Sequence, residues 1–165
     1  IKKHEFGVCS NALLNLKNEE QIKAKIHSNK AFQLPKKKKV ILIANGTGIA
    51  PFLGMLNDNQ TNTHLFFGLK TNESLNLYKP HLKNIEKQHM HIAYSQENNE
   101  YVQDLIAKKE DLIASTLKNK GTIMICGSVA MMNGVLSVLE KITLQQLNRP
   151  LHTFKKAKQI KTDCY

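Results

Sequence analysis

The chain has 165 residues, of which 41% are hydrophobic. This length suits one domain, and the composition supports a packed core and excludes a disordered chain. The longest apolar run, Val40–Ala44, is too short to cross a bilayer, and no signal-peptide pattern opens the sequence. We therefore expect no membrane segment in this chain. Because the sequence opens at Ile1 instead of Met, we expect it to be part of a longer protein.

The formal net charge is +11, and Arg149 is the single arginine among 24 basic residues. Proteins that read nucleic acids or clamp phosphates usually use arginine, whose planar fork makes two parallel contacts, whereas lysine is a point charge on a solvated surface. The composition therefore disfavours nucleic acid as a partner and favours a solvated face or an acidic protein partner.

The cysteines and histidines predict neither disulfides nor a metal site. Cys9, Cys126 and Cys164 are odd in number, far apart and without metal-ligand spacing. This pattern is typical of a reducing compartment, so we expect a location in the cytoplasm or on the cytoplasmic face of a larger protein. Three histidines near predicted strand starts also lack metal-ligand spacing and are interpreted as structural: His64, His89 and His91.

Apolar runs and helical patterns alternate along the chain. A short strand is predicted over Lys23–His27, and the apolar runs predict five further strands over Val40–Asn45, His64–Gly68, His89–Ser95, Thr122–Cys126 and Gln159–Tyr165. Amphipathic spacing predicts helices over Ile49–Asn57, Leu77–Lys87, Val102–Lys109, Glu110–Lys118 and Val129–Leu147. Apolar strands separated by helices are typical of parallel sheets covered on both faces. The predicted fold class is α/β, a doubly wound, Rossmann-like domain with a mainly parallel five-stranded sheet and helices on both faces.

Small residues follow the predicted strands at their carboxyl ends, which is where open α/β sheets bind ligands. The runs concerned are Asn45–Gly48, Gly68–Lys70, Ser95–Glu97 and Cys126–Ser128. Glycines let the backbone approach a pyrophosphate, and the N-terminus of the following helix favours anions. Any one of these loops alone is better explained as a tight turn. Four of them on one predicted edge favour a nucleotide site.

Longer motifs stand in and after the same loops: Gly46–Phe52, Phe66–Gly68 with Leu77-Tyr78, Tyr101–Asp104, Cys126-Gly127 with Met131, and Asp163–Tyr165. Together they resemble the C-terminal, nicotinamide-nucleotide-binding domain of the ferredoxin–NADP reductase family. Gly7–Asn11 and Phe32–Pro35 are similar to the diflavin branch, which includes the sulfite reductase flavoprotein and cytochrome reductases. The resemblance covers about residues 6–165 in the family's order. It implies a trailing segment of a flavin-binding domain in residues 1–35 and an NAD(P)-binding domain in residues 36–165.

The resemblance also implies which residues contact cofactors. One group would hold the pyrophosphate and nicotinamide, a second the adenosine end of the nucleotide, and a third the pyrophosphate of a flavin. The group at the pyrophosphate and nicotinamide is Gly46, Thr47, Gly48 and Gly127. The group at the adenosine end is Lys70, Ser95, Gln96, Tyr101 and Gln103. The group at the flavin pyrophosphate is Gly7, Val8, Cys9 and Ser10.

Three residues near the predicted carboxyl edge are implied to be catalytic. Cys126 resembles the cysteine beside the nicotinamide C4 atom, Asp163 the acidic member of the same network, and Tyr165 the terminal aromatic that stacks on the flavin. Taken singly, Cys126 is more simply a small core residue, Asp163 a solvated cap and Tyr165 a frayed chain end. Their occurrence in the family's order favours the catalytic interpretation.

The implied function is hydride transfer from NADPH or NADH to FAD, with electrons passing on to a flavodoxin-like domain or another acidic carrier. The family's flavin-binding barrel is missing from this sequence, so an upstream barrel domain would hold most of the FAD. The alternative is a basic binding module that has kept the fold and lost the redox chemistry.

Two departures from the family bear on the choice of nucleotide. Gln96 stands where NADP-using relatives carry arginine, and Glu100 stands where they carry lysine. Although Lys70 or Lys108 could reach a 2′-phosphate, the loss of two charge-assisted contacts outweighs the screened attraction of the net charge. We therefore expect NADH to bind at least as well as NADPH.

Overall fold

The computed structural model describes residues 8–25, 27–35, 38–56, 62–83 and 85–165. Its centre is a five-stranded sheet in the order β3-β2-β1-β4-β5, in which every neighbouring pair is parallel. The strands are β1 Val40–Asn45, β2 Thr63–Leu69, β3 Met90–Tyr94, β4 Thr122–Gly127 and β5 Ile160–Cys164. The five strands predicted for the sheet are therefore confirmed, with each end displaced by at most one residue.

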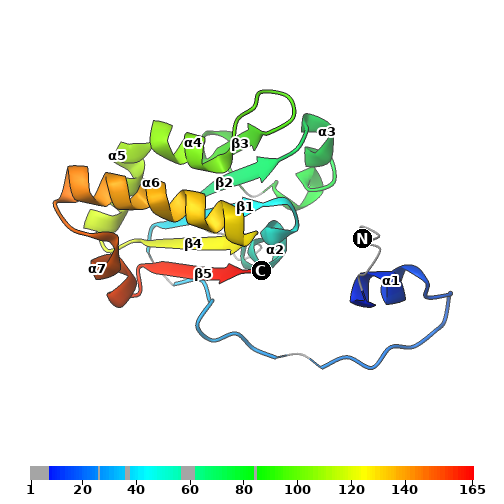
Figure 1. Cartoon of the computed structure of the whole chain (residues 1–165). Coiled ribbons are helices and arrows are strands. Elements are labelled where there is room, and N and C mark those ends of the chain that lie inside the picture. Colours follow the sequence, from blue (N-terminus) through cyan, green and yellow to red (C-terminus); the bar gives the residue numbers. More distant parts are fainter. Residues whose placement is uncertain (1–7, 26, 36–37, 57–61, 84) are drawn as a thin grey trace.

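Helices cover both faces of the sheet, as predicted (Figure 1). The α-helices are α1 Val8–Leu14, α2 Ala50–Leu56, α3 Asn72–Leu75, α4 Val102–Lys108, α5 Glu110–Lys118, α6 Val129–Leu147 and α7 Leu151–Lys156. Short 3-10 turns are η1 Gly46–Ile49, η2 Lys79–His81 and η3 Lys87–His89. Helices α4, α5 and α6 lie together over one face, and α2 lies on the other (Figure 1). The fold is thus a doubly wound α/β sheet.

Each face of the sheet carries its own hydrophobic core, because successive residues of a strand point to opposite faces. In β1, Ile41 and Ile43 belong to the core beneath α4, α5 and α6. Their neighbours Leu42 and Ala44 belong to the second core, which includes Phe52 of α2. All four β1 side chains are fully buried, which explains why this strand is apolar along its whole length.

The order of the strands reverses direction at β1. The chain passes from β1 to β2 and β3 on one side, then crosses back to β4 and β5 on the other. The register aligns Asn45 with Gly68 of β2, Ala44 with Cys126 of β4, and Cys126 with Asp163 of β5. The carboxyl ends of the strands therefore form one edge with a switch point at β1, which is where this type of sheet binds ligands.

The helix predicted over Leu77–Lys87 is wrong. Among its described residues, this stretch contains only the turn η2 and the first residue of η3, and the preceding helix α3 ends at Leu75. Thr71 begins α3 by accepting a hydrogen bond from the Ser74 N–H. Pro80 then has no N–H to give and disfavours helical geometry at the residue before it, so a long helix does not form.

Three further elements also differ from the sequence predictions. The described part of Lys23–His27 is exposed and belongs to no strand. Helix α7 was not predicted, and it begins directly after Pro150. The helix expected from Ile49 begins one residue later, after the turn η1, and the predicted end at Asn57 lies outside the described residues. Among the described residues, no helix combines the length and the hydropathy needed to cross a membrane.

Candidate functional site

A cavity of about 550 Å³ opens at the carboxyl edge of the sheet. Its walls come from the ends of β1, β2 and β3 and from the first turns of α4 and α6. Six of the predicted nucleotide-binding residues line it: Gly46, Thr47, Lys70, Ser95, Tyr101 and Gln103. The structure thus brings together residues from separate loops, as expected of a ligand site at a switch point.

The glycine loop passes very close to the end of β4. A Cβ atom on Gly48 would lie 2.3 Å from the carbonyl oxygen of Cys126 and 2.6 Å from Cα of Gly127. Gly46 has a φ of +51°, a conformation that other residues adopt only under strain. These contacts fix the loop between β1 and β4 and leave Thr47 exposed at the cavity wall.

Asn45 connects the two sides of the switch point and was not among the predicted site residues. Its Oδ1 accepts a hydrogen bond from the Ser128 N–H at 3.0 Å, and its Nδ2 donates to Ser128 Oγ at 3.2 Å. Ser128 Oγ also accepts from the Met131 N–H and so caps α6. A Cβ on Gly127 would lie 2.0 Å from Asn45 Oδ1. Gly127 is therefore needed for this connection, in addition to its predicted place beside the nucleotide.

Cys126, Asp163 and Tyr165 meet beside the main cavity instead of lining it. Cys126 and Asp163 are paired in the register of β4 and β5. The thiol of Cys126 is buried, which, with the charge of Asp163 and the neighbouring Cys164, raises its pKa to about 11. Asp163 is exposed and accepts a 3.4 Å hydrogen bond from Asn29 Nδ2. Because its thiol stays protonated at neutral pH, Cys126 is a poor nucleophile there.

Tyr165 connects this group to the glycine loop. Its hydroxyl lies 2.8 Å from Thr47 Oγ1, and its backbone N–H donates to the Gly127 carbonyl at 3.0 Å. The ring is 70% exposed. Its carbonyl oxygen also accepts a 3.3 Å hydrogen bond from the Val129 N–H. The terminal residue is therefore held at the cavity rim by three hydrogen bonds, while most of the surface of its ring remains free to contact another molecule.

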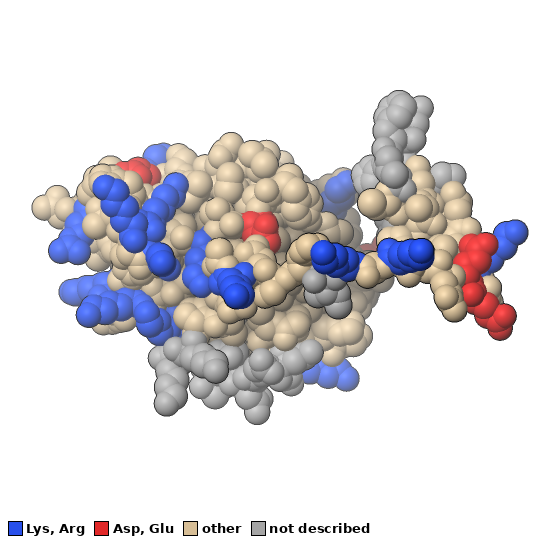
Figure 2. Space-filling model, turned by 90° about the horizontal axis from the view of Figure 1, so that it is seen from below, with Lys and Arg blue, Asp and Glu red and all other residues tan. Residues whose placement is uncertain are grey.

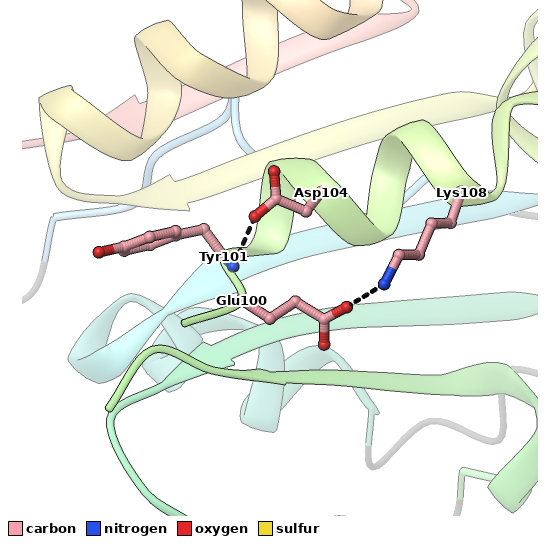
Figure 3. A network of polar contacts seen from close by, with 4 residues as sticks. All are labelled: Glu100, Tyr101, Asp104 and Lys108. Carbon is pink, nitrogen blue, oxygen red and sulfur yellow. Dashed lines mark hydrogen bonds and ion pairs between the residues drawn. The ribbon is translucent and has the colours of Figure 1, made fainter. Parts of the chain in front are cut away.

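The opposite end of the cavity is formed by the turn before α4. The Tyr101 N–H donates to Asp104 Oδ2 at 2.8 Å, which begins the helix, and the Tyr101 ring stays half-exposed at the cavity (Figure 3). The side chain of Gln103 lies close to Gly134 of α6. Tyr101 and Gln103 thus offer a flat ring and an amide on one wall, a combination suited to a nucleobase.

The structure places two residues of the loop before α4, Gln96 and Glu100, differently from the list of predicted site residues. Gln96 is exposed and does not line the cavity, and its N–H donates to the Lys70 carbonyl. Glu100, which was not among the predicted site residues, does line the cavity. It forms an ion pair with Lys108, the last residue of α4 (Figure 3). The sequence signal for Glu100 was its departure from the family pattern, in which lysine stands at this position before Tyr101.

The residues predicted to contact a flavin lie away from this edge. Gly7 is outside the described residues, Val8 and Ser10 lie within α1, and Cys9 is exposed on the same helix. Helix α1 stands apart from the sheet at the far end of an extended segment (Figure 1). The structure therefore does not bring these residues to the cavity. Within the described residues, no three metal-ligating side chains group together.

Comparison with known proteins agrees with this geometry. A family model described as the oxidoreductase NAD-binding domain matches residues 42–137. The chain is 34% identical over 158 residues to a nitric oxide synthase from Anopheles stephensi, covering 83% of this chain and 13% of that protein. It is 32% identical over 139 residues to NADPH-dependent diflavin oxidoreductase 1 from Candida albicans, covering 78% of this chain and 24% of that protein.

A plant reductase and a solved structure are also similar. Root isozyme 1 of the chloroplastic ferredoxin–NADP reductase of Arabidopsis thaliana is 30% identical over 186 positions, covering 96% of this chain and 49% of that protein. A mutant of ferredoxin-NADP+ reductase from Plasmodium falciparum, in complex with 2′P-AMP, has the same fold with a TM-score of 0.64 at 22% identity. That match covers 96% of this chain and 65% of the other.

The chain spans between 13% and 49% of the length of these curated relatives. The family model nevertheless covers β1 to the middle of α6, which includes the glycine loop and most of the cavity wall. The diflavin oxidoreductase among the relatives represents the branch that the motifs resemble. The chain therefore belongs to the oxidoreductase NAD-binding domain family, of the ferredoxin–NADP reductase type.

Proposed function

We propose that this domain binds NADH or NADPH in the cavity and presents the nicotinamide ring for hydride transfer to FAD. The observation that carries the proposal is the hydrogen bond between Thr47 on the glycine loop and the Tyr165 hydroxyl. The Tyr165 N–H also donates to the carbonyl of Gly127, the residue after Cys126 at the end of β4. A nucleotide whose pyrophosphate lay at Gly46–Gly48 would have one end at Cys126 and the other at Tyr101. The activity requires FAD, which accepts the hydride and would be held mainly by a barrel domain upstream.

The close approach of the strand ends supports a nucleotide site at this edge of the sheet. Gly48 and Gly127 leave no space for a Cβ, so the strand ends approach each other closely beneath the ligand. The neutral thiol of Cys126 and the exposed carboxylate of Asp163 lie on neighbouring strands. We assign Cys126 to orienting the ring and Asp163 to the polar environment around it. The protonated thiol supplies packing and a weak hydrogen bond without competing as a nucleophile.

The segment before residue 36 supports its assignment to a neighbouring flavin-binding domain. Leu13, Leu14, Leu16 and Ile22 are exposed there, with Ile22 at 57%. Apolar side chains grouped on one segment usually mark a surface that another domain covers. Phe32, by contrast, is buried against Phe52 with ring centroids 5.8 Å apart. We place the boundary between Phe32 and β1, close to the predicted residue 35.

The electron acceptor would be a flavodoxin-like domain or an acidic carrier. One of the relatives is a diflavin oxidoreductase, and the lysine-rich composition of this chain favours acidic partners. The cytoplasmic location remains a prediction that rests on cysteine spacing.

Flavin reduction in the parent protein tests the proposal. Addition of NADH or NADPH to the protein that includes the upstream sequence should bleach the flavin absorbance, and Cys126→Ala should slow the bleaching while nucleotide affinity stays within a few-fold. A parent protein that carries flavin and is not reduced by either nucleotide would show the proposal to be wrong.

A second function, as a basic binding module, is favoured by the distribution of charge. Exposed cations gather at the amino ends of β4 and β5, around α5 and α7 (Figure 2). They are Lys118, Lys120, Arg149, Lys155, Lys156 and Lys158. This surface is at the opposite end of the sheet from Cys126. Retardation of nucleic acid with a steep salt dependence, in a protein that binds no nicotinamide nucleotide, would favour this alternative.

A further inference from the structure

The side chain of Asn45 binds across the switch point instead of capping its own turn. Asn45 stands directly before the turn η1, at a position where asparagine usually accepts a hydrogen bond from the turn that follows, yet its side chain does not cap η1. The amide instead exchanges two hydrogen bonds with Ser128, the residue after β4, at 3.0 Å and 3.2 Å. Both polar atoms of the amide are therefore used to join two segments that are 83 residues apart in the sequence.

These hydrogen bonds begin where the pairing of the two strands ends. The register of β1 and β4 ends at the pair Ala44 and Cys126. Beyond this pair the chain enters the glycine loop on one side and α6 on the other, and the amide joins Asn45 to Ser128. Gly127 allows the close approach, since a Cβ there would lie 2.0 Å from Asn45 Oδ1. The side chain therefore continues the contact between the two central strands past the end of the sheet.

Ser128 is a rigid partner for this contact. Its Oγ accepts a hydrogen bond from the Met131 N–H at 3.2 Å and so caps α6, a helix of 19 residues. Met131 is buried and belongs to the core beneath α6. Displacement of Ser128 would have to break this cap or move a helix that packs on the sheet. The hydrogen bonds of Asn45 therefore fix the start of the glycine loop against α6.

The two segments that Asn45 joins would hold different parts of a nucleotide bound as in the proposed function. The glycine loop, Gly46–Gly48, begins at the next residue and would hold the pyrophosphate. Cys126, two residues before Ser128, would orient the nicotinamide. Asn45 and Ser128 both line the cavity, whereas Tyr101 forms its opposite end. Asn45 is therefore placed to set the pyrophosphate relative to the nicotinamide, with the adenosine end left unchanged.

We propose that Asn45 is a positioning residue for hydride transfer, because its two hydrogen bonds to Ser128 hold the glycine loop in a fixed position relative to Cys126. This inference rests on the proposed function. In that transfer the C4–H bond of the reduced nicotinamide breaks, and the hydrogen passes with both bonding electrons to FAD, which leaves the nicotinamide oxidised and the flavin reduced. The rate is sensitive to placement, since an error of about 1 Å can cost about a hundredfold. Affinity is less sensitive, because the other contacts of the nucleotide remain.

Two substitutions of Asn45 separate positioning from charge. Asn45→Ala removes both hydrogen bonds and adds no charge. Asn45→Asp can keep both, since its two oxygens accept the Ser128 N–H and hydroxyl, but it places a negative charge beside the glycine loop. We expect Asn45→Ala to slow flavin reduction at saturating NADH about tenfold and to change NADH affinity by less than about threefold. Asn45→Asp should restore most of the rate and weaken NADH binding about tenfold.

Three measurements check these results. Calorimetric titration of NADH into this chain gives the affinities, and rapid mixing of NADH with the parent protein that includes the upstream sequence gives the rates. Amide hydrogen exchange of this chain needs no flavin: the Ser128 N–H should exchange about tenfold faster in Asn45→Ala and stay slow in Asn45→Asp. Asn119→Ala is the matched control, because it removes a 2.8 Å asparagine hydrogen bond to the Ser115 carbonyl at the end of α5, outside the cavity. It should change none of the three.

The outcomes distinguish this inference from the proposed function. An Asn45→Ala protein that reduces flavin at the unsubstituted rate while Ser128 exchanges faster would overturn the role of Asn45 alone. Equal losses of affinity and rate in both variants would do the same, because they would show a merely stabilising contact. Should Asn45→Ala fail to fold, a tenfold loss of rate in Asn45→Asp with slow exchange at Ser128 would also overturn it. Failure of NADH and NADPH to bind the unsubstituted chain would instead overturn the proposed function, and this inference with it.

Discussion

The hydroxyl of Tyr165 lies 2.8 Å from Thr47 Oγ1, so the last residue of the chain contacts the glycine loop that follows β1. Thr47 also lines the cavity. A ligand that formed a hydrogen bond with the Thr47 hydroxyl would compete with Tyr165 for that partner. The exposed ring of Tyr165 would then have to turn away from the cavity rim. The contact therefore couples occupation of the cavity to the position of the terminal aromatic.

Substitution of Tyr165 tests this coupling. Tyr165→Phe keeps the ring and removes the hydrogen bond, while Tyr165→Ala removes both. We expect NADH affinity to rise in the order parent, Phe, Ala, with a total gain of about 1–3 kcal/mol, since a hydrogen bond and a ring contact each contribute about 0.5–1.5 kcal/mol. Calorimetric titration of NADH measures the effect. Three equal affinities would show that Tyr165 does not compete with the nucleotide.

Two glycines of neighbouring elements should respond to alanine in opposite directions. In Gly48→Ala the new methyl group would meet the β4 backbone at 2.3 Å, so we expect a loss of about 1–3 kcal/mol or more in the free energy of unfolding. Gly54→Ala adds a methyl group to an exposed position of α2 with no atom within 4 Å. It should add about 0.5–1 kcal/mol, because alanine favours helix.

Urea unfolding of both variants gives this comparison, with Gly54→Ala as the control for substitution in the same region. A neutral Gly48→Ala would mean that the glycine loop and the β4 end do not approach each other closely. Because a loop displaced from β4 would also leave the cavity wall, NADH affinity should fall only in the Gly48 variant.

Cys126 should be the least reactive of the cysteines toward alkylation. Its side chain is 3% exposed and its pKa is raised to about 11, which leaves about a thousandth of the thiol ionised at pH 8. Cys9, on α1, is exposed. Brief treatment with iodoacetamide followed by peptide mass mapping should therefore modify Cys9 first, and in urea the difference should vanish. Equal modification in the folded protein would contradict the burial of Cys126.

A histidine group at the amino end of β2 makes stability depend on pH. Burial, the nearby His89 and His91, and the cations Lys39 and Lys109 lower the pKa of His64 from 6.5 to about 4. Because the unfolded chain binds this proton more readily, stability is complete above pH 6.5 and is lost as the pH falls toward 4. Allowing for screening by water, we expect a loss of about 1–2 kcal/mol.

Unfolding by urea at several pH values between about 7.5 and 4.5 measures this loss. His64→Gln should flatten the profile, because the titrating ring is gone. His152→Gln removes an exposed histidine of α7 and should leave the slope unchanged. A parent profile already flat over this range would show that the His64 ring is not held neutral.

The sheet could be predicted from the sequence because each strand at its centre is buried on both faces. Runs such as Val40–Asn45 then contain almost nothing but apolar residues, and a short continuous run of this kind, bounded by turn residues, is typical of a buried parallel strand. The region Leu77–Lys87 could not be predicted in the same way. Its apolar spacing resembles a helix, but Pro80 and the cap at Thr71 decide the local structure.

The candidate site was only partly predictable. Glycines that allow close approach, such as Gly48, can be recognised from the loop motif alone. The contribution of Asn45 depends on hydrogen bonds to Ser128, 83 residues away in the sequence, and no local pattern shows that contact. Glu100 was noticed as a departure from the family, but only the structure shows its carboxylate in the cavity wall and paired with Lys108.

The position of the strands within the sheet divides the candidate site into two halves of different local stability. The glycine loop follows β1, the central strand, whose backbone pairs with neighbours on both sides and whose first five residues are fully buried. Asp163 belongs to β5, an edge strand that pairs only with β4 and is largely accessible. In amide hydrogen exchange, β1 should exchange only through global unfolding, and β5 through local opening. Tyr165 can therefore leave Thr47 by fraying of an edge strand, while the loop that it leaves stays in place.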